Sequence, residues 1–448
     1  MSFSAPLPTP GILKRAAAYA REIGRGRTSP AVGGRRPLEL AGIAGASSRS
    51  LTRKSIAVVV PELLPVPPVL GGAIESWVHE MTALMDKAAR RLLVVSRPAG
   101  IPGLPHVEYV GVPWTRTERL FNRLKDAVGR RNPLRYVAKI QNVWSYSRRA
   151  ARAVRGSDIV YVHNEPNLVL FLRRREGQRI VLHMHNDHLS MRAFRRPYRR
   201  ALAKVDTVLC VSEYIRKRAV EAFPEHADKF KVVLNGTDPE VFRPYGDEAW
   251  QRLADIVPLE RSCKYVLYVG RLTSIKGVHV LIQAFPKVLE QWPEARLIIA
   301  GSSFFAGATI TDYERHLSKL AAPIGRAIVF TGYLSHEYLK YLYSVPELVV
   351  VPSVWPEPSG LVVLEGMASG SCVIGTNVGG IPEIIDHQRT GVLVPSDDPA
   401  TLAATSCELL GDPARRTNIG TAARAKIAER HEWRRLVAEL DAVIGADR

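Results

Sequence analysis

The segment 351–370 holds the densest group of residues that could do chemistry. Glu357 lies in a Pro-rich turn after an apolar run, and Glu365 follows it with seven residues between them. A carboxylate can accept hydrogen bonds from two neighbouring hydroxyls through its two oxygens. We therefore expect Glu357 to hold a sugar ring and Glu365 a ribose. The alternative interpretation makes Glu357 an ordinary turn residue and Glu365 a solvent-facing residue of a helix.

A helix is expected to begin within the same segment, at Ser359, Gly360 and Leu361. The first N–H groups of a helix have no partner inside the helix, and they attract anions. This helix start is therefore suited to a diphosphate. One short segment could contact both the phosphates and the sugars of a ligand.

Two cations form a second candidate group. Arg271 and Lys276 lie five residues apart in a loop that follows an apolar run ending in Gly270. Cations at the carboxyl end of a strand can neutralise a leaving diphosphate. A pair of solvated surface cations is the alternative interpretation.

A pair of glycines, Gly71 and Gly72, follows the first expected strand and precedes a helical pattern. Adjacent glycines let the backbone approach a ligand closely, here just ahead of a helix start. An ordinary loop would explain the pair equally well.

The run 183–188 contains three histidines and one aspartate, with His183 and His185 at alternate positions. Alternate positions on a strand face the same side, which would suit metal ligands. The sequence shows no second cluster that could complete such a site, so we expect no metal here. We prefer the interpretation that one histidine lies near a reacting centre.

The elements that position these residues follow a regular pattern from Ser55 onward. Short apolar runs alternate with helical patterns, which is typical of βαβ units on a parallel sheet. We expect strands at 55–61, 91–96, 107–110, 158–163, 180–185, 207–211 and 231–234, then at 265–269, 296–300, 327–330, 348–352, 372–375 and 391–394. The clearest helices are expected at 73–87, 118–129, 135–154, 213–223, 278–291, 337–344 and 360–369. The pattern predicts two consecutive doubly wound α/β domains that bind ligands outside the carboxyl ends of their strands.

The predicted domains have the following bounds. They are a disordered basic arm at 1–54, a first Rossmann-like domain at 55–245, a second at 246–430, and a C-terminal helix at 431–448 that returns to the first domain. No apolar run reaches the roughly 18 residues that span a bilayer. The four cysteines show no CxxC spacing, so we expect buried free thiols in a reducing compartment.

Charge is unevenly distributed along the 448 residues. Residues 1–200 hold 35 basic and 13 acidic side chains, whereas residues 201–448 hold 27 basic and 30 acidic ones. The net charge of +19 is thus +22 on the first part and −3 on the second. This imbalance indicates an anionic partner for the first part: nucleic acid, phospholipid or a phosphorylated acceptor.

Taken together, the motifs resemble those of the retaining glycosyltransferases of the GT-B fold, specifically glycosyltransferase family 4, over roughly residues 55–445. The matching positions are the Glu-x7-Glu pair Glu357 and Glu365, the Arg-x4-Lys pair Arg271 and Lys276, the loop glycines Gly71 and Gly72, and His185, with His183 as the alternative register. The stretches 234–238 and 379–383 are also similar to family stretches, although Thr237 replaces the usual Val. The resemblance implies two Rossmann-like doubly wound domains that face a central cleft.

The resemblance also implies a reaction, the transfer of a sugar from a nucleotide-diphosphate donor to an acceptor hydroxyl with retention of anomeric configuration. Arg271, Lys276, the helix start and Gly72 would stabilise the leaving diphosphate. Glu357 and groups around His185 would hold the sugar as positive charge develops on it. Because no Asp-x-Asp occurs in the chain, we expect neither a metal requirement nor a separate cofactor.

The basic first half indicates where the acceptor comes from. Leu120, Phe121 and Leu124 could share one face of a helix that cations flank, which is the pattern of an interfacial helix. The alternative is a normal amphipathic helix that packs on the sheet. We expect a cytoplasmic protein, peripheral on the inner membrane face, that acts on a glycan or lipid-linked acceptor in polysaccharide, lipopolysaccharide or glycolipid synthesis.

Three other classes of protein agree less well with the sequence. A non-catalytic structural or coat-associated protein could keep the fold, although the chemical motifs are intact. Another GT-B enzyme, such as an epimerase or a phosphorylase, agrees less well with the paired motifs. A nucleic-acid binder is disfavoured because few aromatic residues interleave with the arginines and no recognition motif occurs.

Overall fold

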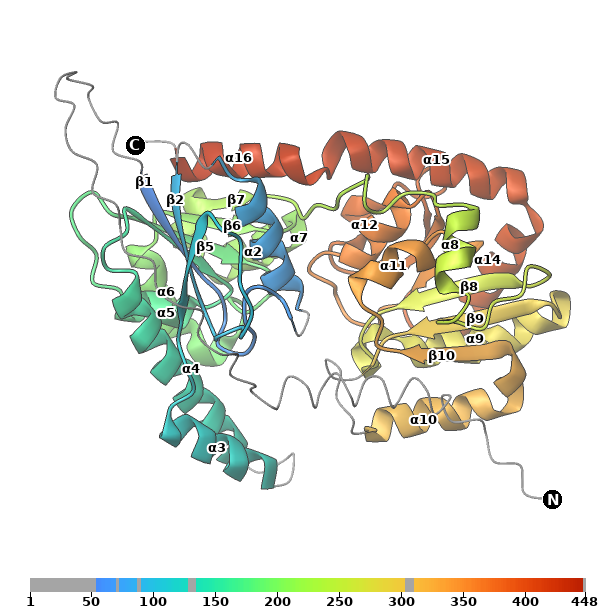
Figure 1. The fold of residues 1–448 in the computed structure, drawn as a ribbon, viewed down its shortest axis with the longest axis horizontal. Helices are drawn as coiled ribbons and strands as arrows, with labels where there is room; N and C mark the ends of the chain where they lie inside the picture. The colour runs from blue at the N-terminus through green and yellow to red at the C-terminus, as the bar shows by residue number, and fades with distance from the viewer. Residues whose placement is uncertain (1–53, 70–71, 87–89, 128–133, 303–309, 446–448) are drawn as a thin grey trace, which may run out of the picture. The chain divides into compact units, whose positions relative to one another are not determined.

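The computed structural model describes residues 54–69, 72–86, 90–127, 134–302 and 310–445 (Figure 1). The predicted basic arm, apart from Lys54, lies outside the described residues. The same holds for Gly71, whereas its neighbour Gly72 is described. The chain beyond Lys54 builds two parallel sheets, which confirms the predicted α/β fold class.

The first sheet contains seven parallel strands in the order β3-β2-β1-β4-β5-β6-β7. Their bounds are β1 Lys54–Val59, β2 Arg90–Ser96, β3 Val107–Gly111, β4 Ile159–His163, β5 Arg179–Met184, β6 Thr207–Cys210 and β7 Phe230–Val232. The central strands are buried on both faces, as expected from their nearly continuous β-branched and apolar runs.

Helices cover both faces of the first sheet. One face packs against α4 Leu134–Ala153, α5 Pro166–Phe171, α6 Arg195–Lys204 and α7 Glu213–Ala222. The other face packs against α2 Ala73–Leu84 and α16 Trp433–Gly445. Helix α3 Arg116–Ala127 lies against α4, and short 3-10 turns occur at Arg192–Phe194 and Pro224–Lys229. The last helix of the chain therefore contributes to the core of the first sheet, while the exact domain boundaries stay predictions.

The second sheet contains six parallel strands in the order β10-β9-β8-β11-β12-β13. Their bounds are β8 Lys264–Val269, β9 Ala295–Ala300, β10 Ile328–Gly332, β11 Leu348–Val351, β12 Cys372–Thr376 and β13 Val392–Val394. Two separate apolar cores lie on the two faces of this sheet.

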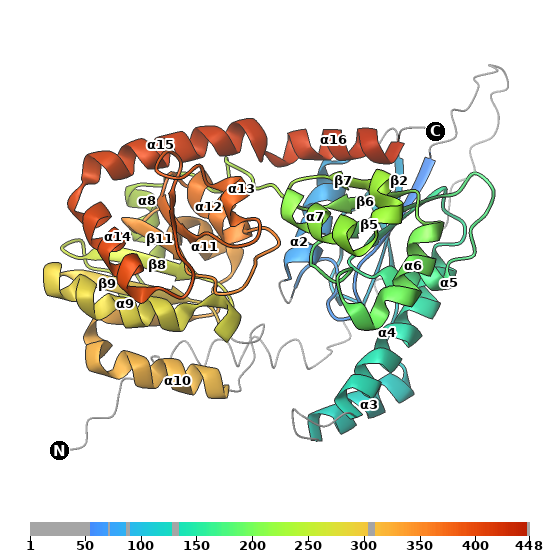
Figure 2. The same ribbon diagram turned by 180° about the vertical axis from the view of Figure 1, so that it is seen from behind.

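One face of the second sheet packs against α9 Val278–Gln291, α10 Asp312–Ala321 and α14 Pro399–Gly411 (Figure 2). The opposite face packs against α8 Asp247–Leu253, α11 His336–Leu342, α12 Leu361–Ala368, α13 Ile381–Ile384 and α15 Pro413–Arg430. Two 3-10 turns, η3 Ser274–Lys276 and η4 Ala322–Ala327, complete the described elements.

In each sheet, the order in which successive strands are added reverses at one point, between two neighbouring strands. Gly72, the Arg271 loop and the Glu357 turn follow strands at these points. In the second sheet this point lies between the neighbouring strands β8 and β11, which are followed by the Arg271 loop and the Glu357 turn. In the first sheet it lies between β1 and β4, and Gly72 follows β1. Open α/β sheets bind ligands at such switch points.

The four cysteines, at 210, 263, 372 and 407, are free and buried, which confirms the prediction for them. Burial raises the pKa of Cys210 and of Cys372 to about 12. Thiols of this kind are inert, because the reactive species is the thiolate.

Candidate active site

The loop after β8 is held against the end of β11 by close backbone contact. Gly277 has a φ of 71°, and a Cβ at this position would lie 1.7 Å from the carbonyl oxygen of Pro352. The N–H of Val354 also donates to the carbonyl of Ile275, at 3.0 Å. Only glycine fits at position 277 without moving the loop, so this residue fixes the distance between the two motifs.

The contact brings two of the predicted site residues together. Lys276 Nζ lies 2.5 Å from Glu357 Oε1, and the hydroxyl of Ser353 donates to the same oxygen at 2.7 Å. Glu357 is buried, whereas Lys276 keeps about a quarter of its side chain exposed. Among the described residues, the second oxygen of Glu357 has no hydrogen-bond partner. Glu357 is therefore a buried, paired carboxylate, and its role toward a sugar stays a prediction.

Arg271 occupies the other end of the same loop. Its side chain is exposed and has no partner among the described residues, while its carbonyl accepts a hydrogen bond from the hydroxyl of Tyr268 at 2.9 Å. Because Lys276 is paired with Glu357, Arg271 is the cation of this loop whose guanidinium can bind an anion.

Two glycines that the sequence motifs left without a role support the Glu357 turn. Gly379 has a φ of 59°, and a Cβ there would lie 2.1 Å from the carbonyl oxygen of Glu357. The N–H of Gly380 donates to that same carbonyl at 2.6 Å. The stretch 379–383 therefore packs against the backbone of the Glu357 turn.

Glu365 lies on α12, which starts immediately after the Glu357 turn. The hydroxyl of Tyr343 donates to Glu365 Oε2 at 2.7 Å, and burial raises the pKa of the Glu365 carboxyl. Its partner shows that Glu365 does not simply face solvent. At the start of the helix, Gly360 is the N-cap residue and no side chain caps the free N–H groups, including that of Leu361.

The helix α7 of the first sheet starts against this same region. The hydroxyl of Ser212 donates to the carbonyl of Pro358 at 2.5 Å. The carboxylate of Glu383 accepts hydrogen bonds from the N–H groups of Glu213 and Tyr214, at 2.7 and 2.6 Å. A carboxylate from the second half of the chain thus caps a helix of the first half.

In the first sheet, Gly72 precedes α2 with a φ of 113°. A Cβ at Gly72 would lie 2.2 Å from Oε2 of Glu75 and would displace this carboxyl group, and the positive φ itself favours glycine. Glu75 is buried, and burial raises its pKa to about 7. The first turn of α2, directly after Gly72, therefore carries a carboxyl group with a pKa near neutrality.

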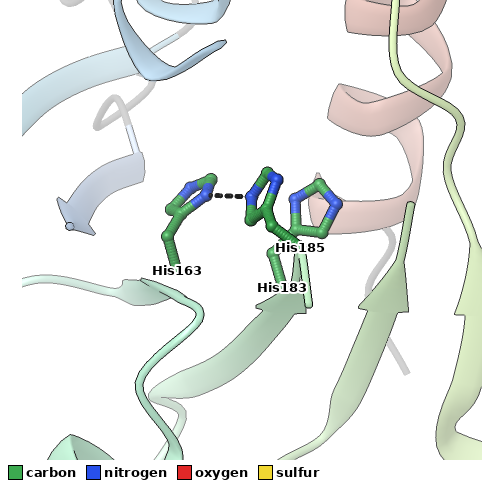
Figure 3. A group of neighbouring side chains, drawn as sticks. All are labelled: His163, His183 and His185. Carbon is green, nitrogen blue, oxygen red and sulfur yellow. Dashed lines mark hydrogen bonds between the residues drawn. The ribbon is translucent and has the colours of Figure 1, made fainter. Parts of the chain in front are cut away.

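Three histidines meet at the carboxyl ends of β4 and β5, as Figure 3 shows. His163 Nδ1 lies 2.9 Å from His185 Nε2, and His183 Nδ1 lies 2.6 Å from the hydroxyl of Tyr161. One ring nitrogen from each histidine lies within 4.8 Å of the others. The expectation that no further residue could complete a cluster around His183 and His185 was wrong, because His163 from the neighbouring strand does so.

Burial keeps the cluster neutral. It holds the pKa of His163 and His183 well below the usual range and lowers that of His185 to about 3. Neutral imidazole is the form that binds metals, and the Nε2 atoms of His163 and His183 have no partner in the structure. The ring of Trp77 lies 4.9 Å from that of His183 and packs on the cluster. Of the three histidines, His185 alone keeps measurable exposure, at 8%.

The structure thus groups the predicted residues into three sets that no direct contact joins. Lys276 and Glu357 form one set, Glu365 pairs with Tyr343, and His185 pairs with His163. The sequence motifs missed Tyr343, Ser353 and His163. No helix among the described residues is both long enough and apolar enough to cross a membrane.

Comparison with known proteins gives matches in both halves. The family Glycosyltransferase Family 4 matches residues 105–241, and the family Glycosyl transferases group 1 matches residues 254–426. The chain is 30% identical over 360 residues to YtcC of Bacillus subtilis, which is assigned to the glycosyltransferases, covering 78% of this chain and 81% of YtcC. It is 27% identical over 399 residues to spore coat protein SA of the same organism, covering 88% of this chain and all of that protein.

Solved structures agree in fold. HepE of Anabaena in complex with UDP aligns with a TM-score of 0.67 at 18% identity, covering 87% of this chain and 99% of HepE. Sucrose-phosphate synthase of Thermosynechococcus elongatus aligns with a TM-score of 0.72 at 22% identity, covering 87% of this chain and 98% of the synthase. With a GT-B fold and matches in both halves, the chain belongs to the glycosyltransferases of family 4, the glycosyl transferases group 1.

Proposed function

We propose that this chain is a retaining hexosyltransferase. It moves a sugar from a nucleotide-diphosphate donor to a hydroxyl of a glycan or lipid-linked acceptor, in cell-surface polysaccharide or glycolipid synthesis at the inner membrane face. The observation that supports this most strongly is the pairing of Lys276 with Glu357 at the switch point between β8 and β11, beside the exposed Arg271.

The leaving group determines what the second sheet must do. When the bond between the anomeric carbon and the diphosphate oxygen breaks, its electron pair leaves with the diphosphate. Arg271, Lys276 and the uncapped start of α12 at Gly360 supply positive charge for that group. Glu365, at hydrogen-bond distance from Tyr343, accepts the ribose hydroxyls of the nucleotide.

The sugar itself is held by Glu357. Lys276 and Ser353 occupy one oxygen of this carboxylate, and the other oxygen remains for the sugar hydroxyls. Positive charge that develops at the anomeric carbon is balanced by the diphosphate on the same face. The acceptor oxygen then bonds to the anomeric carbon from that face, and its proton passes to the departing phosphate oxygen. This order of events retains the configuration.

His185 contributes as a neutral hydrogen-bonding group near the sugar rather than as a base. Its pKa of about 3 keeps the ring uncharged at neutral pH. His163, at 2.9 Å, fixes which ring nitrogen is available. Gly72 brings backbone close to the diphosphate, as its positive φ allows.

Named relatives support the donor and the pathway. HepE has been solved with UDP and with UDP-glucose, which favours a nucleotide-sugar donor here. The lipopolysaccharide 1,2-N-acetylglucosaminetransferase of Salmonella typhimurium is 24% identical over 347 residues, covering 75% of this chain and 84% of that enzyme. This likeness favours a cell-surface glycan as the acceptor. The excess of cations in residues 1–200 supports an anionic membrane as a contact partner, and we propose no nucleic-acid partner.

The experiment that tests the proposal compares the wild-type chain with Lys276→Ala. A thermal-shift screen against UDP, GDP and ADP first selects the nucleotide, and hydrolysis of the corresponding nucleotide-sugars is then measured by nucleotide release. We expect wild-type turnover and a loss of at least about a hundredfold in the variant, because the leaving charge loses a cation. Lys264→Ala, a pair-forming lysine at the other end of β8, is the control and should keep turnover.

A second function is favoured by one finding, the likeness to spore coat protein SA along its whole length. In that case the chain would be a non-catalytic, coat-associated protein that keeps the GT-B fold. The same screen separates the two functions. A chain that binds none of the three nucleotides and turns over no nucleotide-sugar would contradict the transferase proposal and favour the coat role.

A further inference from the structure

Apolar side chains are exposed in an unusual concentration on α3 and α4. Of the thirteen large apolar side chains that are exposed among the described residues, five lie on these two helices. They are Leu120 (56% exposed), Leu124 (47%), Val137 (52%), Ile140 (44%) and Trp144 (49%). Exposed apolar clusters of this kind mark interaction surfaces.

The two helices form one unit. Helix α3 packs against α4, and the amide of Asn142 donates to the amide oxygen of Asn122 at 2.8 Å (Figure 1). Leu120 and Leu124 are one turn apart on α3. The interpretation of α3 as a helix that buries these leucines on the sheet is therefore wrong, although Phe121 between them is half-buried.

The exposed residues of α4 also share a face. Val137, Ile140 and Trp144 follow the i, i+3, i+7 spacing of a helical stripe. The opposite face of α4, with Tyr146 and Ala150, is buried against the first sheet. An amphipathic helix normally has one apolar face, whereas α4 has a buried one and an exposed one.

The charge on this unit is strongly positive. Five exposed cations lie on the same two helices as the apolar side chains, namely Arg116, Arg119, Arg123, Lys139 and Arg148. Among the side chains that the structure describes on α3 and α4, Glu118 is the single acid. It is fully buried and pairs with Arg97 at 3.5 Å and with Arg149 at 2.7 Å. Among the side chains that the structure describes, the exposed surface of α3 and α4 therefore combines apolar side chains with cations and carries no exposed acid.

We propose that the α3–α4 unit docks on an anionic lipid bilayer. The five apolar side chains enter the boundary between headgroups and acyl chains, and the arginines contact lipid phosphates. The inference deepens the proposed function, since it identifies the surface that would bring the enzyme to a lipid-linked acceptor. Charge favours this occupant over a second copy of the chain, because two copies of the unit would place arginines against arginines.

The test is co-sedimentation of the full chain with vesicles of phosphatidylcholine alone or with 30% phosphatidylglycerol, about the range in which anionic lipid attracts polybasic surfaces. We expect recovery with the anionic vesicles at low salt and little recovery with neutral ones. The triple variant Leu120→Ser, Leu124→Ser, Ile140→Ser should bind about tenfold more weakly or worse. The triple variant Arg116→Gln, Arg119→Gln, Arg123→Gln should do the same.

A matched control separates this surface from total charge. The variant Arg326→Gln, Arg389→Gln, Arg434→Gln removes the same number of exposed cations from other elements and should bind like wild type. Brominated acyl chains should quench the fluorescence of wild type more than that of Trp144→Phe. Equal recovery with both vesicle types, or equal loss in the control variant, would overturn the proposal.

The remaining outcomes separate this inference from the proposed function. Nucleotide-sugar hydrolysis in solution should be unchanged in both α3–α4 variants. A wild-type chain that hydrolyses a nucleotide-sugar but does not bind anionic vesicles would overturn the docking surface alone. A wild-type dimer in light scattering that becomes monomeric in the Ser variant would assign the surface to a second copy instead.

Discussion

At the scale of single residues, the site depends on carboxylates whose neighbours differ. Glu357 is paired with Lys276, whereas Glu365 accepts one hydrogen bond from Tyr343 and is not paired with a cation. Removing Glu357 should therefore affect substrate binding and turnover differently from removing Glu365.

For Glu365 we expect the variant Glu365→Gln to raise the KM for the nucleotide-sugar by about tenfold while kcat changes little. A hydrogen bond to a charged acceptor is worth about 1.5–3 kcal/mol, and this one would be made equally in the ground and transition states. Gln keeps an acceptor for Tyr343, so the fold should persist. Tyr343→Phe is the control variant. An unchanged KM in Glu365→Gln would contradict the proposed contact between Glu365 and the ribose hydroxyls.

Glu75 allows a prediction about pH. Its pKa is raised by burial from 4.5 to about 7, so the folded protein favours the protonated form. Its contribution to stability is fully present below pH 4.5 and is lost as the pH rises through about 7. We expect Glu75→Gln to unfold about 2 to 6 °C higher than wild type at pH 8, with the difference shrinking at pH 5.

The measurement for Glu75 is thermal unfolding at the two pH values. The exposed Glu337 on α11 provides the control Glu337→Gln, which should follow wild type at both. If Glu75→Gln unfolds at a lower temperature than wild type at pH 8, the Glu75 carboxylate is stabilised by a partner. Burial would then not raise the pKa of Glu75 as expected.

At the residue scale, the sequence motifs assigned Lys276 and Glu357 to one site, and the structure brings these two side chains into contact. Arg271 and Lys276 share one loop, and their positions near the Glu357 turn follow from adjacent strands. His163 was missed because it lies 20 residues before His183, and only the register of β4 on β5 places them together. Tyr343 gave no signal, since one tyrosine on a helical pattern is indistinguishable from a core residue.

At the scale of elements, glycines set the distances between the loops. Gly277 and Gly332 both have a φ of 71°, yet a Cβ at 277 would meet Pro352 whereas one at 332 would meet nothing within 4 Å. The two positions therefore share backbone strain and differ in steric contact.

This difference gives a prediction for the η3 loop. Gly277→Ala must push the loop away from β11 and so separate Lys276 from Glu357, and we expect kcat/KM to fall by at least about tenfold. Gly332→Ala carries the same strain, about 1–2 kcal/mol, and should lower stability while leaving kcat/KM close to wild type. Equal kcat/KM values in the two variants would show that the loop contact does not position Lys276.

The elements themselves were largely predictable. Long β-branched runs predicted the strands, because parallel strands are buried on both faces. The short helix α5 was overlooked even though Glu165 caps it and Pro166 occupies its first turn, which is a recognisable helix start. Helix α6 was overlooked because its first residues, 195–200, contain four arginines that obscure the apolar face formed by Tyr198, Ala201 and Leu202.

At the scale of the whole molecule, the asymmetry of charge along the sequence broadly follows the two sheets. Residues 1–200, which carry the excess of cations, include the first five strands of the first sheet and the α3–α4 unit, and the nearly neutral residues 201–448 include the whole second sheet. The strand orders place Gly72, the Arg271 loop and the Glu357 turn at switch points, which patterns along the sequence alone do not reveal.

The expectation of metal-independent catalysis belongs to this scale, because the three-histidine cluster lies in the first sheet and the loop with Arg271 and Lys276 follows a strand of the second. We expect the purified chain to hold no stoichiometric zinc and to keep its nucleotide-sugar hydrolysis in a chelator. The measurements are elemental analysis and turnover with and without the chelator. Loss of activity that manganese restores, or zinc that disappears in His163→Ala, would contradict the prediction.

The burial of all four thiols has a practical consequence. A cysteine introduced at an exposed position such as Ile140 would be the fastest-reacting thiol in the described part of the chain, since the native ones are shielded and those at 210 and 372 ionise only at high pH. A fluorophore or spin label could thus be attached at one chosen place while every native cysteine stays. Solvent-sensitive dyes placed in this way would report the depth of each helix turn in a lipid environment.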